Sequence, residues 1–337
     1  PEAYEFYLKA KLKYEKRENT EDTKIARKLL QIAISLDNDL LDAKGDLGWT
    51  YFRTSDYDKA MEIWTPTLKQ AEELGDKSGM GMILNYIGLT YYQKGEYDKA
   101  SEFFIHSIKI KKEIGEKSGL GYSFLNMGNI GIGKGEYDKA LEYYNYSFDI
   151  FNNLGDKYGL GWCLCSYGFV YEVKGDYDKA LDNFESSLEL GEEIGYLYGM
   201  GRSLYCIGYH FWYRGDLEKA VDYLTKSLKI CEKIGNKSGI GRSLSVIGYI
   251  NYNKGLFEQA KENLEKSIAI QKEIHLKEAN LLLETTIYIY FTYRHLHKKC
   301  DIKAIHSLIK DTEYIMFNSN YRLYQLLEDT TYLETAY

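Results

Sequence analysis

Proline and clustered positive charge are both scarce in this chain of 337 residues. Proline occurs only as Pro1 and Pro66, so no proline-rich linker divides the chain into separate domains. The 43 basic and 50 acidic residues give a net charge of −7, and no basic run is long enough to neutralise a series of phosphates. We therefore do not expect the chain to bind nucleic acid.

Long apolar runs and a secretory signal pattern are also missing. The longest uncharged apolar stretches fall far short of the ~20 residues that span a bilayer, so we expect no membrane insertion. Five cysteines, scattered through periodic segments, are typical of buried thiols in a reducing compartment and favour a cytoplasmic location. The chain begins with Pro1 rather than methionine, and Tyr337 interrupts a helical pattern, which predicts a segment of a longer polypeptide.

Glycine, by contrast, is abundant and recurs with a period of 40 residues. One column of glycines begins at Gly48, a second at Gly75 and a third at Gly95, while alanines form a fourth column from Ala60. Four columns of small residues that share one spacing indicate an array of structural repeats. The first and fourth columns comprise Gly48, Gly88, Gly128, Gly168, Gly208, Gly248, Ala60, Ala100, Ala140, Ala180, Ala220 and Ala260.

Each period predicts two amphipathic helices. In residues 76–115, a first apolar stripe at helical spacing is broken at Gly95, and a second stripe ends at Gly115. Glycine suits the left-handed backbone that often follows a helix. Glycines inside the first helix each cost ~1 kcal/mol relative to alanine. We therefore expect Gly88 to permit close helix approach, with Ala100 as the matching small residue.

The apolar and small residues of one period resemble the signature of the tetratricopeptide repeat, a helix–turn–helix unit. They are Leu84, Ile87, Gly88, Tyr91, Ala100, Phe104 and Ser107. The period of 40 residues is similar to that of Pins-type polarity scaffolds and of repeat arrays attached to bacterial cyclases, kinases and transcription regulators. The resemblance implies an all-α solenoid of about eight helix–turn–helix repeats, wound as a right-handed superhelix with a concave groove.

We expect a single solenoid over residues 1–337. Residues 1–40 are predicted as a divergent first repeat, 41–280 as six regular repeats, 281–311 as a degenerate repeat and 312–337 as a partial hairpin. End repeats lack a stacking neighbour on one side, so self-association through the terminal repeats stays open.

Helical geometry places four columns, at positions 82, 85, 89 and 92 of the repeat, on a face of each first helix that lines the groove in tetratricopeptide arrays. The column at 82 comprises Met82, Tyr122, Trp162, Arg202 and Arg242. These columns vary along the chain and are rich in Tyr, Trp and Arg, which dominate binding energy at interfaces. Arg202 and Arg242 are predicted to hold carboxylates of an acidic peptide. The predicted peptide-binding residues are Trp162, Phe169, Arg202, Tyr205, Tyr209, Trp212, Arg242, Tyr249 and Tyr252.

An alternative is that these aromatic side chains simply pack between neighbouring first helices. The pattern predicts no catalytic site, cofactor or metal: His295 and His297, two residues apart on a helix, cannot share a face. We expect a non-catalytic scaffold that binds a protein or peptide. Two other functions stay open. One is a regulatory sensor module of a larger signalling protein whose catalytic or DNA-binding domain lies outside this chain. The other is carbohydrate recognition by the tyrosine and tryptophan side chains of the four columns.

Overall fold

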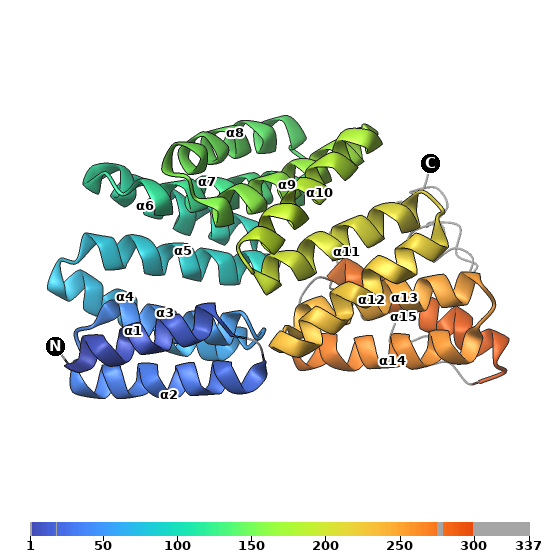
Figure 1. Ribbon diagram of the computed structural model, residues 1–337, viewed down its shortest axis with the longest axis horizontal. Helices are drawn as coiled ribbons and strands as arrows, with labels where there is room; N and C mark the ends of the chain where they lie inside the picture. The colour runs from blue at the N-terminus through green and yellow to red at the C-terminus, as the bar shows by residue number, and fades with distance from the viewer. Residues whose placement is uncertain (1, 18, 275–278, 299–337) are drawn as a thin grey trace.

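The computed structural model describes residues 2–17, 19–274 and 279–298, which form fifteen α-helices and no β-strand (Figure 1). The predicted all-α fold is therefore confirmed, whereas residues 299–311 of the predicted degenerate repeat and the predicted hairpin 312–337 lie outside the described residues. The helices are α1 (Glu2–Glu15), α2 (Thr20–Leu36), α3 (Leu41–Phe52), α4 (Tyr57–Leu74), α5 (Lys77–Gln93), α6 (Tyr97–Ile114), α7 (Lys117–Gly133), α8 (Tyr137–Leu154), α9 (Lys157–Lys174), α10 (Tyr177–Glu193), α11 (Leu197–Tyr213), α12 (Leu217–Ile234), α13 (Lys237–Asn253), α14 (Phe257–Glu273) and α15 (Ala279–His295).

The helices form an inner and an outer layer. Each helix packs most extensively against its neighbours in the chain, and the odd-numbered helices from α3 to α15 also contact one another. Within the described ranges, the even-numbered helices share no comparable contacts. An array that is packed more closely on one side curves toward that side. The odd-numbered helices therefore form the concave layer (Figure 1).

The turns between helices follow from capping chemistry. Gly115 ends α6 with a φ of 71°, a conformation that glycine adopts without the strain of a Cβ. At the start of α5, the backbone N–H of Gly79 donates to the Asp76 carboxylate at 3.0 Å. This bond satisfies one of the free N–H groups at the helix N-terminus. Equivalent caps begin α7, α9 and α13.

The inner glycines make room for a large side chain of the paired helix. A Cβ added at Gly88 would lie 2.7 Å from the Phe104 ring, and one added at Gly128 would lie 2.3 Å from the Tyr144 ring. The close approach expected at Gly88 is therefore confirmed, but Ala100 is wrong as its partner. Phe104 lies one helical turn beyond Ala100 on the same face of α6, and its ring fills the space above the glycine.

Buried serines fix the register of the five helix pairs from α5–α6 to α13–α14. The hydroxyl of Ser107 donates to the carbonyl oxygen of Gly81 at 2.7 Å, and Ser187 donates to Gly161 at 2.8 Å. An unmade hydrogen bond at such a site would cost roughly 1–3 kcal/mol. The register is therefore strongly specified. The same bond is made by Ser147, Ser227 and Ser267.

The curved array brings its early repeats into contact with later ones. The turn between α3 and α4 reaches the starts of α11 and α13, and Figure 1 shows the N-terminal helices beside the α12–α14 region. Arg53 Nη2 donates to the Tyr196 hydroxyl at 2.8 Å, and the Ser238 backbone N–H donates to Ser55 Oγ at 3.1 Å. We call this contact between Arg53, Ser55, Tyr196 and Ser238 the seam. The seam closes the superhelix around its inner face.

Candidate ligand-binding cavity

The closed superhelix contains a cavity of about 810 Å³. Every odd-numbered helix from α1 to α13 contributes side chains to its wall, because these helices form the concave layer. The seam residues complete the wall. Ligand sites in proteins usually have volumes of roughly 300–1,000 Å³. The cavity is therefore large enough to be a ligand site.

One repeat column lines the cavity along its whole length. All five members of the column at position 82 contribute to the wall, from Met82 on α5 to Arg242 on α13. Three of the nine predicted peptide-binding residues belong to this column, and Tyr205 joins them from the column at 85. The cavity thus brings together Trp162, Arg202, Tyr205 and Arg242.

The other predicted residues pack against neighbouring rings and do not line the cavity: Phe169, Tyr209, Trp212, Tyr249 and Tyr252. The Tyr249 ring centre lies 4.2 Å from that of Tyr288, and its hydroxyl lies 2.9 Å from Thr285 Oγ1. Tyr249 is 1% exposed. It therefore belongs to the core rather than to the predicted open surface, because α11, α13 and α15 press their aromatic side chains together.

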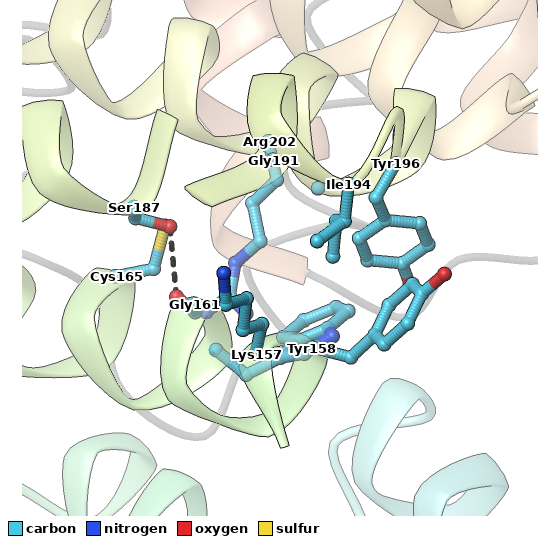
Figure 2. Close-up of a pocket in the computed structure, with 11 residues that line it drawn as sticks. Lys157, Tyr158, Gly161, Cys165, Ser187, Gly191, Ile194, Tyr196 and Arg202 are labelled. Carbon is cyan, nitrogen blue, oxygen red and sulfur yellow. Dashed lines mark hydrogen bonds between the residues drawn. The ribbon is translucent and has the colours of Figure 1, made fainter. Parts of the chain in front are cut away.

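Arg202 has a positive charge that no described carboxylate neutralises. Its guanidinium carbon lies 4.2 Å from the centre of the Trp162 ring, and its Nη1 is buried without a hydrogen-bond partner among the described residues. Figure 2 shows its side chain extending toward the α9 segment that carries Gly161. A guanidinium stacked on a ring keeps the N–H groups at its edge available. Arg202 is therefore placed to bind an acidic group.

Buried thiols lie beside Arg202. A hydrogen bond from Cys206 lowers the pKa of Cys165, and the positive charge of Arg202 also favours the thiolate. Cys165 and Cys206 are each 1% exposed. Burial raises the pKa of the nearby Cys163 to about 12, so this side chain stays a neutral thiol. These cysteines are buried next to the arginine and do not line the cavity, so they do not form an exposed nucleophilic site.

Amide side chains add hydrogen-bonding groups to the same wall. Asn126 Nδ2 donates to Asn85 Oδ1 at 3.1 Å, which joins α7 to α5. Asn129 Oδ1 accepts from the Tyr144 hydroxyl at 2.8 Å. All three asparagines line the cavity. Asparagine offers both donors and acceptors, which match the N–H and C=O groups of an extended backbone.

The sequence prediction missed the cavity residues of the first repeats. Trp49 occupies the column at 89 one repeat earlier, so this column could have identified it. Arg17 and Arg53 lie at turns and belong to no groove column, and only the closure of the superhelix brings them to the cavity. The missed residues from the N-terminal side and the seam include Tyr14, Arg17, Trp49, Arg53, Tyr196 and Tyr198.

No three His, Cys, Asp or Glu side chains described by the structure lie close enough to hold a metal ion. No described helix is both long and apolar enough to cross a membrane. Cys300 and His306, which follow His295 and His297 in the sequence, lie outside the described residues.

The fold and the cavity define a class of protein: an α-helical solenoid of helix–turn–helix repeats whose concave layer lines a ligand-sized space. Three segments of the sequence, residues 39–113, 120–193 and 199–273, match the tetratricopeptide repeat family. The chain therefore belongs to the tetratricopeptide repeat family. No curated protein matches the sequence.

Solved structures share this fold at low sequence identity. A Rap protein complexed with competence and sporulation factor aligns over 99% of this chain and 97% of its own, with a TM-score of 0.66 and 13% identity. NprR in complex with its cognate peptide NprX aligns over 93% and 92%, with a TM-score of 0.63 and 15% identity. A signal transduction ATPase with a tetratricopeptide repeat sensor from Pyrococcus horikoshii aligns over 94% of this chain but only 48% of its own, with a TM-score of 0.56 and 16% identity. At these identities the likeness establishes the fold.

Proposed function

We propose that this chain is a non-catalytic module that binds an extended peptide, or a segment of a partner protein, in the interior cavity. The main support for the proposal is that Arg202, which lines the cavity, has no carboxylate partner among the described residues. Aromatic and amide side chains line the same cavity. Aromatic side chains supply contact area, asparagines bind backbone groups, and the arginine fixes an acidic group. The NprR structure, which contains a bound peptide, has the same fold.

If peptides bind in the cavity, their affinity depends on Arg202 but not on an arginine outside the cavity. Arg214 is a matched control because it also stacks on a ring, 4.4 Å from the centre of Tyr177, but is exposed and outside the cavity wall. Peptides selected from a random display library on the wild-type chain are to be measured against Arg202→Gln and Arg214→Gln by calorimetry. Loss of a charge-assisted hydrogen bond worth roughly 1.5–3 kcal/mol lowers affinity about ten- to a hundredfold.

The expected result is a loss of at least about tenfold in Arg202→Gln and an unchanged affinity in Arg214→Gln. Far-UV circular dichroism and thermal melts establish that both variants fold. Equal affinity in all three chains would place the peptide outside the cavity and contradict the proposal. Selection of no peptide at all would also count against it.

The seam favours a second candidate function, that of a regulatory sensor module within a larger signalling protein. The seam joins distant repeats through a small number of contacts, and the cavity wall includes residues on both of its sides, such as Arg53 and Tyr198. A ligand that contacts both sides would stabilise the closed superhelix relative to an open one. Small-angle scattering with and without a selected peptide tests this candidate. A smaller radius of gyration with peptide supports it, and an unchanged radius opposes it.

A further inference from the structure

Arg53 is a buried cation at the seam, and its Nε donor is unused among the described residues. It is 7% exposed, and its guanidinium carbon lies 3.1 Å from the centre of the Tyr198 ring and 5.4 Å from that of Trp49. Its Nη2 donates to the Tyr196 hydroxyl, while its Nε is buried with no hydrogen-bond partner in the described chain. The rings hold the guanidinium in place and leave an N–H edge for an acceptor.

A second arginine lies on the same part of the cavity wall. The guanidinium carbon of Arg17 lies 4.0 Å from the centre of the Tyr14 ring, and its Nη1 donates to the Tyr14 carbonyl at 2.6 Å. Burial, together with the positive charge of Arg53, lowers the pKa of Arg17. The Tyr14 hydroxyl is buried and has no described hydrogen-bond partner. Two cations and a free hydroxyl therefore share one region of the cavity wall.

Among the residues that the structure describes, no carboxylate pairs with Arg17 or Arg53. The described groups that favour the charged forms of Arg17 and Arg53, and so act to raise their pKa values, are tyrosines and not carboxylates. Glu15 and Asp46 also line the cavity, but no described ion pair joins either carboxylate to Arg17 or Arg53. Glu15 is exposed, and Asp46 lies against Tyr7 and Lys11, where burial raises its pKa to about 6. Buried charges are normally paired, because an unpaired charge loses its hydration without compensation. An anion from outside the chain would supply the missing partner.

Arg53 is connected to Arg202 through two neighbouring rings, those of Tyr198 and Trp162. Arg202 lies 4.2 Å from the Trp162 ring centre, the Trp162 and Tyr198 rings lie 5.8 Å apart, and Arg53 lies 3.1 Å from Tyr198. These distances place the guanidinium carbons of Arg53 and Arg202 no more than about 13 Å apart. An extended chain advances roughly 3.3 Å per residue, so this separation corresponds to at most about four residues.

We propose that Arg17 and Arg53, with the Tyr14 hydroxyl, form a carboxylate-binding subsite for an acidic residue of a peptide whose second acidic residue, within about four positions, contacts Arg202. The subsite deepens the proposed function, on which it rests, and it names the ligand class: an extended peptide with two spaced carboxylates and an aromatic or apolar residue between them. The intervening residue would lie against the Trp162 and Tyr198 rings.

Two capped tetrapeptides of nearly equal shape test this subsite, Ac-Glu-Ala-Tyr-Glu-NH2 and Ac-Gln-Ala-Tyr-Gln-NH2, together with inorganic phosphate. Their affinities are to be measured by calorimetry and tryptophan fluorescence on the wild-type chain and on Arg17→Gln, Arg53→Gln and Arg214→Gln. Arg53 also contributes to the seam, so Arg17→Gln serves as the second variant if Arg53→Gln unfolds. We expect the acidic peptide to bind at least about tenfold more tightly than its amide counterpart, and Arg17→Gln and Arg53→Gln to reduce this preference to the part that Arg202 supplies. Arg214→Gln is expected to keep it.

The possible outcomes separate the subsite from the proposed function. If library peptides still require Arg202 but the acidic probe binds equally well to wild type, Arg17→Gln and Arg53→Gln, the subsite is wrong and peptide binding in the cavity stands. If phosphate binds in an Arg53-dependent way and the acidic peptide does not, the site takes a small anion and the carboxylate assignment is wrong. If the affinity of library peptides does not depend on Arg202 either, both proposals are wrong.

Discussion

A pair of glycines on α9 tests how the solenoid is packed. A Cβ added at Gly168 would lie 2.4 Å from Phe184 Cε1, whereas the atom nearest a Cβ at Gly161 is Ser187 Oγ at 3.7 Å. Phe184 is 1% exposed, so its ring has little room to move. Overpacking of this kind costs roughly 3 kcal/mol, from which about 1 kcal/mol of gained helix propensity is subtracted.

Gly168→Ala is therefore expected to destabilise the chain by about 2 kcal/mol, and Gly161→Ala to stabilise it by up to about 1 kcal/mol. Urea denaturation followed by circular dichroism measures both, with midpoints compared directly because repeat arrays need not unfold in one step. The two substitutions are chemically identical and lie in one helix, so propensity alone predicts the same shift for both. Shifts of equal sign and size would refute the packing argument.

Two further predictions concern stability. Burial raises the pKa of Asp46 from 3.8 to about 6. The folded chain thus holds this proton more tightly, and the free energy of unfolding falls by up to about 3 kcal/mol as pH rises from about 4 to 6. Asp46→Asn is expected to unfold at higher urea than wild type at pH 7 and to lose this pH dependence; equal profiles would contradict the assignment. Deletion of residues 117–156, one full period, should leave a cooperatively unfolding solenoid, whereas deletion of residues 117–136 should not. Similar melting curves for the two deletions would argue against independent repeat stacking.

Features set within one repeat could be predicted from the sequence. The helix pairs, the turn glycines and the column at position 82 follow from local periodicity and helical geometry, and the structure places all five members of that column in the cavity wall. The partner of Gly88 was mispredicted because Ala100 and Phe104 lie on the same helix face, and only side-chain size decides which fills the gap.

Features that depend on superhelical curvature could not be predicted. Whether Tyr249 faces a groove or the core depends on how closely α11, α13 and α15 approach one another, which a single repeat does not specify. The contact between Arg53 and Tyr196 spans 143 residues and results from the rotation accumulated over four repeat steps. A small change in rotation per repeat would separate these residues, so the repeat sequence gives no sign of the subsite at the seam.

Photo-crosslinking would show whether the ligand binds inside the superhelix. A library-selected peptide carrying a benzophenone group is to be irradiated with the wild-type chain, and the attachment sites mapped by mass spectrometry. We expect attachment to cavity residues of the odd-numbered helices, such as Tyr122, Trp162 and Tyr205. Attachment to exposed side chains of the even-numbered helices, such as Ile105 and Tyr146, would contradict it.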